Sequence, residues 1–252
     1  MSEPRLRQEL SKYSQRMWQR GWVANHDGNL SHRLRRSRLM CTPTAQSKIE
    51  IRPEMMLVVD ESGKVLSGSL RPFSELNLHL AYYQARADVN AVVHAHPPAA
   101  TALAAAGLSL DKPFLPEAVV SLGAVIPTVP LAMPGVPAVQ AMGPYVDDYD
   151  ALVIAGNGVI CCGSDLEQAY LRLELVEHLA EIACRAHSLG GIKALPAPML
   201  KPLLDARRRA GLGPEARGRS SVDAGGLNRT DDGQLASLVR REVIRVLKPG
   251  TE

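Results

Sequence analysis

The chain has 252 residues, a formal net charge of +3 and 46% hydrophobic residues, values that are ordinary for a globular protein with a sizeable buried core. So small a charge attracts nucleic acid only weakly, and two phenylalanines, two tryptophans and six tyrosines offer few surfaces for base stacking. No apolar run approaches the roughly 20 residues that a membrane span needs. We therefore expect neither nucleic-acid binding nor a transmembrane segment.

The first residues and the cysteines indicate the compartment. The polar start over residues 1–5 contains an acid and is followed by no apolar stretch, so we expect no secretory signal and a cytoplasmic location. The four cysteines have neither the spacing of a metal finger nor the density of a disulfide scaffold. We expect them to be reduced and mostly buried.

The first half of the chain predicts helices and strands in alternation. A helix is expected over residues 2–20, two strands over 29–42 and a hairpin over 56–66. Ser74 is a candidate cap for a helix over 75–86, whose first turn carries Glu75 at the positive end of the helix dipole. An acid at this position is stabilised in its ionised form.

The second half continues the alternation. Ala91-Val92-Val93 predicts a buried strand that Pro97 stops, followed by a short helix over 99–106 and strands at 118–120, 125–129 and 151–154. Ser164 begins a capping box for a helix that runs to about residue 189. The pattern predicts an α/β domain over residues 1–192.

The last sixty residues differ in composition. Residues 193–233 are rich in proline and glycine and are expected to be a linker. Residues 234–252 carry apolar side chains at helical spacing and predict a tethered amphipathic helix. This helix either packs on its own domain or a neighbouring subunit, or docks onto another protein. Its basic residues add binding to a membrane surface as a third alternative.

The sequence His94-Ala95-His96 predicts a metal site. Residues two apart on a strand point to the same side, so both imidazoles face one point. With Glu75 they would supply nitrogen, nitrogen and oxygen donors, which suit Zn²⁺ and other borderline divalent cations. The alternative is that both histidines are ordinary surface or core residues.

An ordered set of motifs over about residues 4–190 resembles the class II aldolase/adducin family. The motifs are Gly28-Asn29-Leu30-Ser31, Thr42-Pro43-Thr44, Ser74-Glu75 with His79, and Ala91 to His96. The resemblance implies a central, mainly antiparallel sheet covered by helices on both sides. It also implies a homotetramer with its active site between subunits.

The resemblance assigns roles to the candidate metal site. It makes His94 and His96 ligands of a divalent metal, usually Zn²⁺, and Glu75 the acid/base that exchanges with substrate on the metal. The family has a third histidine ligand where this chain has Asn157. A carboxamide binds zinc less well than an imidazole, so we expect weaker zinc binding, a harder cation such as Mn²⁺ or Mg²⁺, or no metal.

The resemblance also implies a pocket for a substrate phosphate. The matching positions are Gly28, Asn29, Thr44 and Ser74. Ala45 and Phe73 replace a glycine and a serine of the family, and the aromatic ring is expected to fill space in the pocket. Glu117 is a second candidate acid/base or an ordinary surface residue. His26 and His79 either support the site from behind or are merely solvated or packed.

These observations predict a metal-dependent lyase that cleaves or forms a carbon–carbon bond in a small hydroxy-ketone or sugar derivative, with or without a phosphate. Related epimerase or decarboxylase chemistry would use the same groups. The competing hypothesis is a non-catalytic, adducin-like assembly protein, which the loss of the third histidine favours. The presence of Glu75, His94 and His96 together favours the enzyme.

Overall fold

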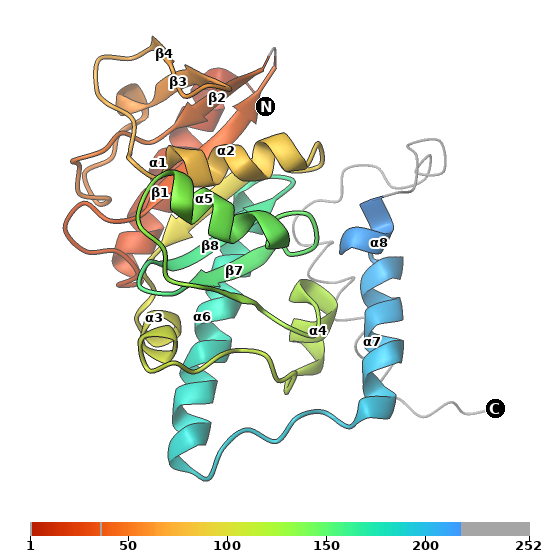
Figure 1. Cartoon of the computed structure of the whole chain (residues 1–252). Coiled ribbons are helices and arrows are strands. Elements are labelled where there is room, and N and C mark those ends of the chain that lie inside the picture. The colour runs from red at the N-terminus through yellow and green to blue at the C-terminus, as the bar shows by residue number, and fades with distance from the viewer. Residues whose placement is uncertain (1, 36, 218–252) are drawn as a thin grey trace.

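The computed structural model describes residues 2–35 and 37–217, and one sheet organises them (Figure 1). Its strand order is β4-β3-β2-β1-β5-β8-β7-β6. Every neighbouring pair is antiparallel except β6 and β7, which are parallel. The strands are β1 (Asn29–Leu34), β2 (Arg38–Cys41), β3 (Leu57–Asp60), β4 (Val65–Ser67), β5 (Ala91–Ala95), β6 (Thr128–Val129), β7 (Ala151–Ile154) and β8 (Gly158–Gly163).

Helices cover both faces of the sheet, as expected from the sequence. One face packs against α1 (Glu3–Gln19), α3 (Pro98–Ala105), α4 (Pro116–Leu122) and α6 (Leu166–Ser188). The other packs against α2 (Leu76–Ala85) and α5 (Val136–Met142). Short 3₁₀ helices occupy Pro53–Met55 and Gly143–Tyr145. Along β5, Val93 joins the first core and Val92 the second, because successive side chains of a strand point to opposite faces.

Helix α1 shows why these elements form where the sequence places them. Leu6, Leu10, Tyr13 and Met17 recur every three or four residues and are buried against the sheet. A proline in the first turn costs no hydrogen bond, because that N–H has no partner inside the helix. The amphipathic stripe therefore fixes which side of α1 faces the core.

Two expected elements differ in the structure. Residues 118–120, expected to be a strand, lie inside helix α4, and the expected strand over 125–129 shortens to Thr128–Val129. A short, fully buried apolar run has no polar face. Its sequence therefore shows neither the two-residue period of a half-buried strand nor the 3.6-residue period of an amphipathic helix. The cap of α6 is Asp165 rather than Ser164, since the Asp165 side chain accepts a hydrogen bond from the Gln168 N–H.

The expected linker over 193–233 is wrong for the part that the structure describes. Helix α7 (Ala197–Arg209) and the short α8 (Pro214–Arg217) lie within it. Leu203 and Ala206 of α7 pack against Val119 and Val120 of α4. Residues 218–233, and the helix expected over 234–252, lie outside the described residues.

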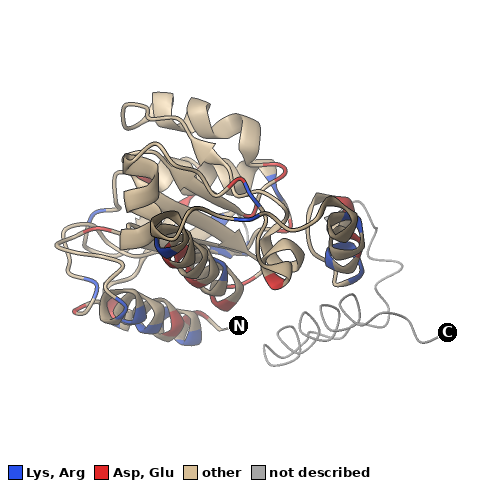
Figure 2. Cartoon of the chain, turned by 90° about the horizontal axis from the view of Figure 1, so that it is seen from below, with Lys and Arg blue, Asp and Glu red and all other residues tan. Residues whose placement is uncertain are grey.

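Acidic and basic residues are interspersed along the helices, as the coloured ribbon in Figure 2 shows. This mixture agrees with the small net charge. None of the described helices combines the length and the apolar character that a bilayer span requires.

A buried acid ties α7 to the rest of the domain. Asp150, just before β7, is 1% exposed and forms ion pairs with Arg86 at 2.8 Å, Arg172 at 3.0 Å and Arg207 at 2.8 Å. These arginines come from the end of α2, from α6 and from α7. A buried carboxylate is stable when cations and hydrogen bonds satisfy it, so this cluster fixes three helices to one end of the sheet.

We predict that Asp150→Asn lowers the free energy of unfolding by about 3–5 kcal/mol, because it leaves buried arginines without their counter-charge. Urea denaturation followed by circular dichroism measures the change. Asp148→Asn, at an exposed position two residues away, is the control and should stay within about 0.5 kcal/mol of the parent. A loss below about 1 kcal/mol for Asp150→Asn would show that the cluster is not structurally important.

Candidate metal centre

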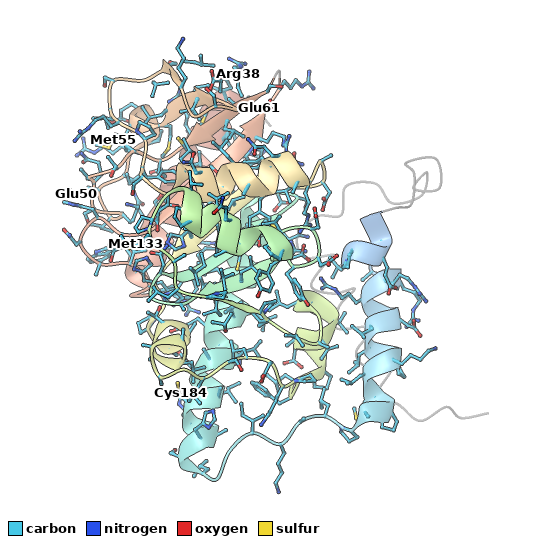
Figure 3. The ribbon with its side chains drawn as sticks, viewed as in Figure 1. Arg38, Glu50, Met55, Glu61, Met133 and Cys184 are labelled. Atoms are coloured by element: carbon cyan, nitrogen blue, oxygen red, sulfur yellow. The ribbon has the colours of Figure 1, made fainter. Side chains whose placement is uncertain are left out.

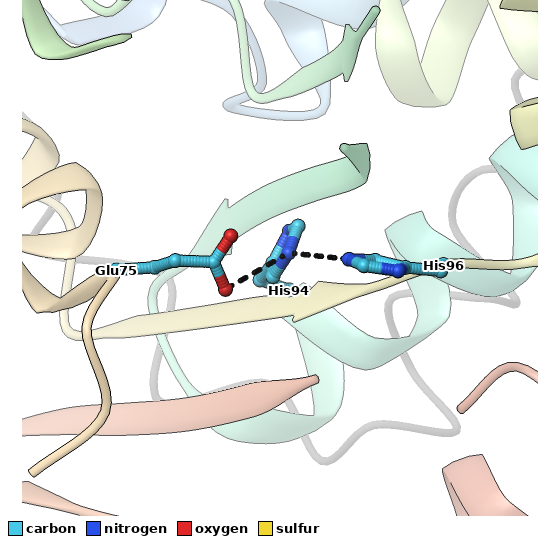
Figure 4. Close-up of side chains that lie close together, drawn as sticks. All are labelled: Glu75, His94 and His96. Atoms are coloured by element: carbon cyan, nitrogen blue, oxygen red, sulfur yellow. Dashed lines mark hydrogen bonds and ion pairs between the residues drawn. The ribbon is translucent and has the colours of Figure 1, made fainter. Parts of the chain in front are cut away.

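Strand β5 and the start of helix α2 bring the candidate metal ligands together (Figure 4). His94 lies in β5 and His96 directly after it, while Glu75 is the N-cap residue of α2. The His94 side chain is fully buried, and those of Glu75 and His96 are 23% and 31% exposed. The centre therefore has a buried floor and an open side.

One nitrogen or oxygen atom of each of the three side chains lies at the centre. The His94 Nε2 lies 3.2 Å from the His96 Nε2 and 3.3 Å from the Glu75 Oε2. One ligand atom from each residue falls within a span of 4.8 Å. Two imidazoles and a carboxylate at this spacing form a donor set of the kind that zinc and similar cations bind.

The orientation of His94 is fixed from behind. Its Nδ1 lies 2.9 Å from the carbonyl oxygen of Val159. A carbonyl oxygen only accepts, so Nδ1 carries the proton and Nε2 presents a lone pair to the centre. A backbone carbonyl that holds the far nitrogen is the usual support of a metal-binding histidine. The residues present thus fit a divalent cation.

Gly158 allows this support to form. A Cβ atom there would lie 2.3 Å from the Ala95 carbonyl oxygen and 2.8 Å from the His96 Cδ2, and its φ is +77°. Both the close approach and the left-handed backbone require glycine. The Asn157-Gly158 turn can therefore pass directly behind the histidines.

Two amides hold the carboxylate of Glu75. The Asn157 Nδ2 donates to Oε1 at 2.6 Å, and the Asn29 Nδ2 donates to Oε2 at 2.9 Å. Burial opposes ionisation, but the positive charge that His94 carries when both of its ring nitrogens are protonated, together with the hydrogen bonds, outweighs it and holds the pKa of Glu75 well below its usual range. Glu75 is therefore a carboxylate at neutral pH.

The predicted metal ligand Asn157 reaches the site, and there it contacts Glu75. Its amide group donates to the carboxylate, a role that the sequence pattern did not suggest. Asn29, predicted to bind substrate, is 3% exposed and likewise uses its amide on Glu75. Residues expected at the metal and at the substrate thus both position the acid.

The other predicted substrate residues surround the centre less tightly. Gly28 has φ +72°, and a Cβ there would meet Val23 at 2.5 Å and the His94 carbonyl at 3.1 Å, so close packing alone requires glycine. The Thr44 N–H donates to the Arg71 carbonyl at 2.9 Å, which places the Thr44 loop beside the segment that leads to exposed Ser74. These two loops flank the start of α2.

Phe73 and Glu117 differ from expectation. The Phe73 ring is 6% exposed and packs on the His79 ring with centroids 4.9 Å apart, so it belongs to the core rather than filling a substrate pocket. Glu117 is exposed in the first turn of α4, a helix that packs against α6 and α7. Its role as a second acid/base stays a prediction that these contacts do not support.

Sequence reasoning missed two charged residues, Asp27 beside His96 and Lys48, which interacts with Asp27. The Asp27 Oδ2 lies 3.7 Å from the His96 Nδ1. Lys48 is 1% exposed and donates to the carbonyl oxygens of His26 and Gln46, and burial lowers its pKa to about 8. No spacing rule connects Lys48 to the glycine-rich loop, so only the fold reveals that it joins the loops around Gly28 and Thr44.

An antiparallel sheet covered by helices, with a two-histidine and carboxylate centre at its middle strands, defines a class of metal-dependent α/β enzymes. Residues 8–184 match the model of the Class II Aldolase and Adducin N-terminal domain. The chain therefore belongs to the class II aldolase and adducin family, as its motifs predicted. The class II aldolases of this family depend on a metal, which agrees with the donor set described above.

Relatives of this chain include decarboxylases, aldolases and a dehydratase. The chain is 33% identical to 3-oxo-tetronate 4-phosphate decarboxylase of Escherichia coli over 185 residues, which cover 71% of this chain and 86% of the enzyme. It is 29% identical to 5-deoxy-D-ribulose 1-phosphate aldolase of Bacillus thuringiensis over 199 residues, which cover 78% and 92%. A solved L-fuculose 1-phosphate aldolase superposes with a TM-score of 0.75 at 26% identity, covering 81% of this chain and 97% of the aldolase. These relatives agree with the predicted lyase activity.

We predict that Asn157→His tightens Zn²⁺ binding by roughly 10-fold or more, because an imidazole nitrogen replaces a weakly binding amide beside Glu75. Isothermal titration with Zn²⁺ measures the affinity. Asn77→His, at an exposed position on α2, is the matched control and should leave the affinity unchanged. Equal affinities for Asn157→His and the parent would mean that position 157 does not reach the ion.

Proposed function

We propose that the protein is a metal-dependent lyase that breaks or forms a carbon–carbon bond beside the ketone of a small, sugar-like substrate. The observation that carries the proposal is the Glu75 carboxylate, held by two amides, 3.3 Å from an imidazole nitrogen with a free lone pair. Zn²⁺ suits the nitrogen-rich donor set best, with Mn²⁺ and Mg²⁺ as alternatives. A purely structural protein has no physical need for this cluster.

The residues divide the chemistry between them. His94, His96 and Glu75 would hold the cation, which when bound draws electron density from the ketone oxygen of the substrate. In aldol cleavage, Glu75 removes the proton of the hydroxyl group on the carbon that becomes the aldehyde. The electron pair of the broken bond passes to the carbon beside the ketone. That carbon then takes the proton back from Glu75, so that protons and electrons balance.

Decarboxylation is the second candidate activity, because one of the relatives at 33% identity is a decarboxylase. Loss of carbon dioxide also leaves an electron pair on the carbon beside a ketone. No hydroxyl proton has to be removed first, so protonation of that carbon is the remaining task for an acid. The same centre serves both reactions, and the substrate decides between them.

A phosphate on the substrate would fit the loops around Thr44 and Ser74. Both loops border the first turn of α2, where the positive end of the helix dipole favours an anion. The names of the decarboxylase and of the ribulose aldolase above specify phosphorylated substrates, 3-oxo-tetronate 4-phosphate and 5-deoxy-D-ribulose 1-phosphate. We therefore propose a phosphorylated substrate.

The homotetramer expected from the family has support from an apolar surface patch. Leu131, Met133 and Val136, between β6 and the first turn of α5, are 75%, 74% and 65% exposed, and Met133 is labelled in Figure 3. A Cβ at Gly156 would lie 2.8 Å from the Leu131 side chain, so the patch begins next to Asn157. Exposed apolar patches of this kind mark association surfaces. From the sequence alone, we also propose a cytoplasmic location and docking of the C-terminal segment onto another protein.

We predict that the purified protein, loaded with Zn²⁺ or Mn²⁺, cleaves either a 3-oxo-tetronate 4-phosphate with release of carbon dioxide, or a ketose 1-phosphate with release of an aldehyde. Glu75→Gln should lower kcat by about 100-fold or more, because the amide can neither accept the hydroxyl proton in aldol cleavage nor donate a proton to carbon after decarboxylation. Glu50→Gln, at an exposed position labelled in Figure 3, is the control and should keep full activity. Full activity of Glu75→Gln, or no turnover of either substrate by metal-loaded protein, would contradict the proposal.

We predict that the double variant Leu131→Asp, Met133→Asp lowers the oligomer mass measured by light scattering, because burying two carboxylates at a subunit contact is costly. Leu189→Asp, at a position that is 87% exposed and distant in sequence, should leave the mass unchanged. A parent protein that is already monomeric, or a double variant with the mass of a parent tetramer, would exclude this patch as the interface.

A further inference from the structure

A row of buried polar groups continues inward from Glu75. Asn29 and Ser31 lie two residues apart on β1 and point to the α2 side of the sheet. His79 and Tyr83 lie four residues apart on α2 and face them. All four are between 0% and 5% exposed, and none of them is one of the three candidate metal ligands.

Short hydrogen bonds connect these groups in order. The Asn29 Oδ1 lies 2.6 Å from the His79 Nε2. The His79 Nδ1 lies 2.7 Å from the Ser31 Oγ, which in turn lies 2.8 Å from the Tyr83 hydroxyl. The row therefore joins the core of the protein to the amide that holds Glu75.

The donor and the acceptor of each hydrogen bond in the row follow from the chemistry of the groups that it joins. The Asn29 amide must donate through Nδ2 to the Glu75 carboxylate, so its Oδ1 needs a donor, which is the His79 Nε2–H. A neutral imidazole with its proton on Nε2 accepts at Nδ1, so Ser31 donates there and accepts from Tyr83. Every donor points toward Glu75.

We propose that His79 is a positioning residue, which in its Nε2–H tautomer locks the Asn29 amide in the orientation that donates to Glu75. With the amide reversed, its oxygen would face the carboxylate and its NH₂ would face the Nε2–H of His79. Both contacts would be repulsive in a site without solvent to relieve them. His79 thus determines where the Glu75 carboxylate lies relative to His94 and His96.

The surroundings of His79 suit a fixed, neutral ring. Burial lowers the pKa of His79 to about 3, so the ring carries a single proton at neutral pH. The Phe73 ring packs against it with centroids 4.9 Å apart, which restricts rotation. The aromatic residue that replaces a serine of the family therefore has a function in this chain: it closes the pocket around His79.

The proposal rests on the proposed function only for its effect on turnover, and two measurements are independent of activity. The first is the tautomer of His79 in the zinc-loaded protein at pH 7, read from the ¹⁵N shifts of the imidazole nitrogens. The second is the affinity for Zn²⁺, because Glu75 belongs to the donor set. A role in folding stability alone would change neither quantity.

The experiment compares His79→Gln, His79→Leu and the parent by zinc titration well below their melting temperatures. A glutamine amide can donate from near the position of Nε2, whereas leucine cannot donate at all. We expect His79→Leu to weaken Zn²⁺ binding by roughly 10-fold or more, and His79→Gln to restore most of this loss. In an active protein, kcat should fall in parallel, with KM within about 2-fold of the parent value.

A second pair of variants covers the case in which His79→Leu does not fold. Ser31→Ala removes the donor to Nδ1 and should weaken Zn²⁺ binding by a few-fold. Ser14→Ala, another fully buried serine, on α1, should not. An Nδ1–H tautomer in the parent, or unchanged zinc affinity in both His79→Leu and Ser31→Ala, would overturn the proposal. No turnover with the zinc effects intact would refute the proposed function and leave the role of His79 standing.

Discussion

The register of β1 against β5 is the constraint on which the site depends. It pairs Asn29 with His94 across the two central strands, while β8 on the other side pairs Val159 with Ala95. A shift of one residue in either pairing would turn His94 or Asn29 to the opposite face of the sheet. With the register in place, the Val159 carbonyl fixes the tautomer of His94, and Asn29 reaches the acid that α2 presents from above the sheet.

The replacement of the family's third histidine has a structural consequence beyond one lost ligand. Asn157 turns its amide to Glu75, so the carboxylate is held from both sides rather than from one. The replacement therefore weakens the binding of the cation and at the same time holds the Glu75 carboxylate more rigidly. A centre with fewer nitrogen donors and a well-fixed carboxylate suits chemistry in which proton transfer matters as much as polarisation of the ketone.

Sequence patterns predicted the architecture because the strands and the long helices have clear periods and clear ends. The pairing of His94 with His96 followed from their spacing, and Glu75 followed from its place at a helix start and from the family motifs. The role of Asn29 did not, because an amide beside a glycine is equally typical of a loop that binds substrate. The helical conformation of residues 118–120 was hidden because that run is buried on all sides.

Long-range contacts between ionic groups were the other part that the sequence did not reveal. Asp150 has partners that come from three helices. The proline- and glycine-rich composition of residues 193–233 suggested a linker, although α7 lies within this range and is anchored by Arg207. For His79 the sequence left two alternatives open: it supports the site from behind, or it is merely solvated or packed. Its hydrogen bonds to Ser31 and Asn29 distinguish a supporting role from simple packing, and they depend on strand and helix being placed together.

The central claim is that one divalent cation binds between His94, His96 and Glu75. Anomalous X-ray diffraction from crystals soaked in Zn²⁺ tests it most directly. We expect a single strong peak at about 2.0–2.1 Å from the Nε2 atoms of both histidines. A peak elsewhere, or no peak at this position in crystals with an ordered and accessible site, would contradict it.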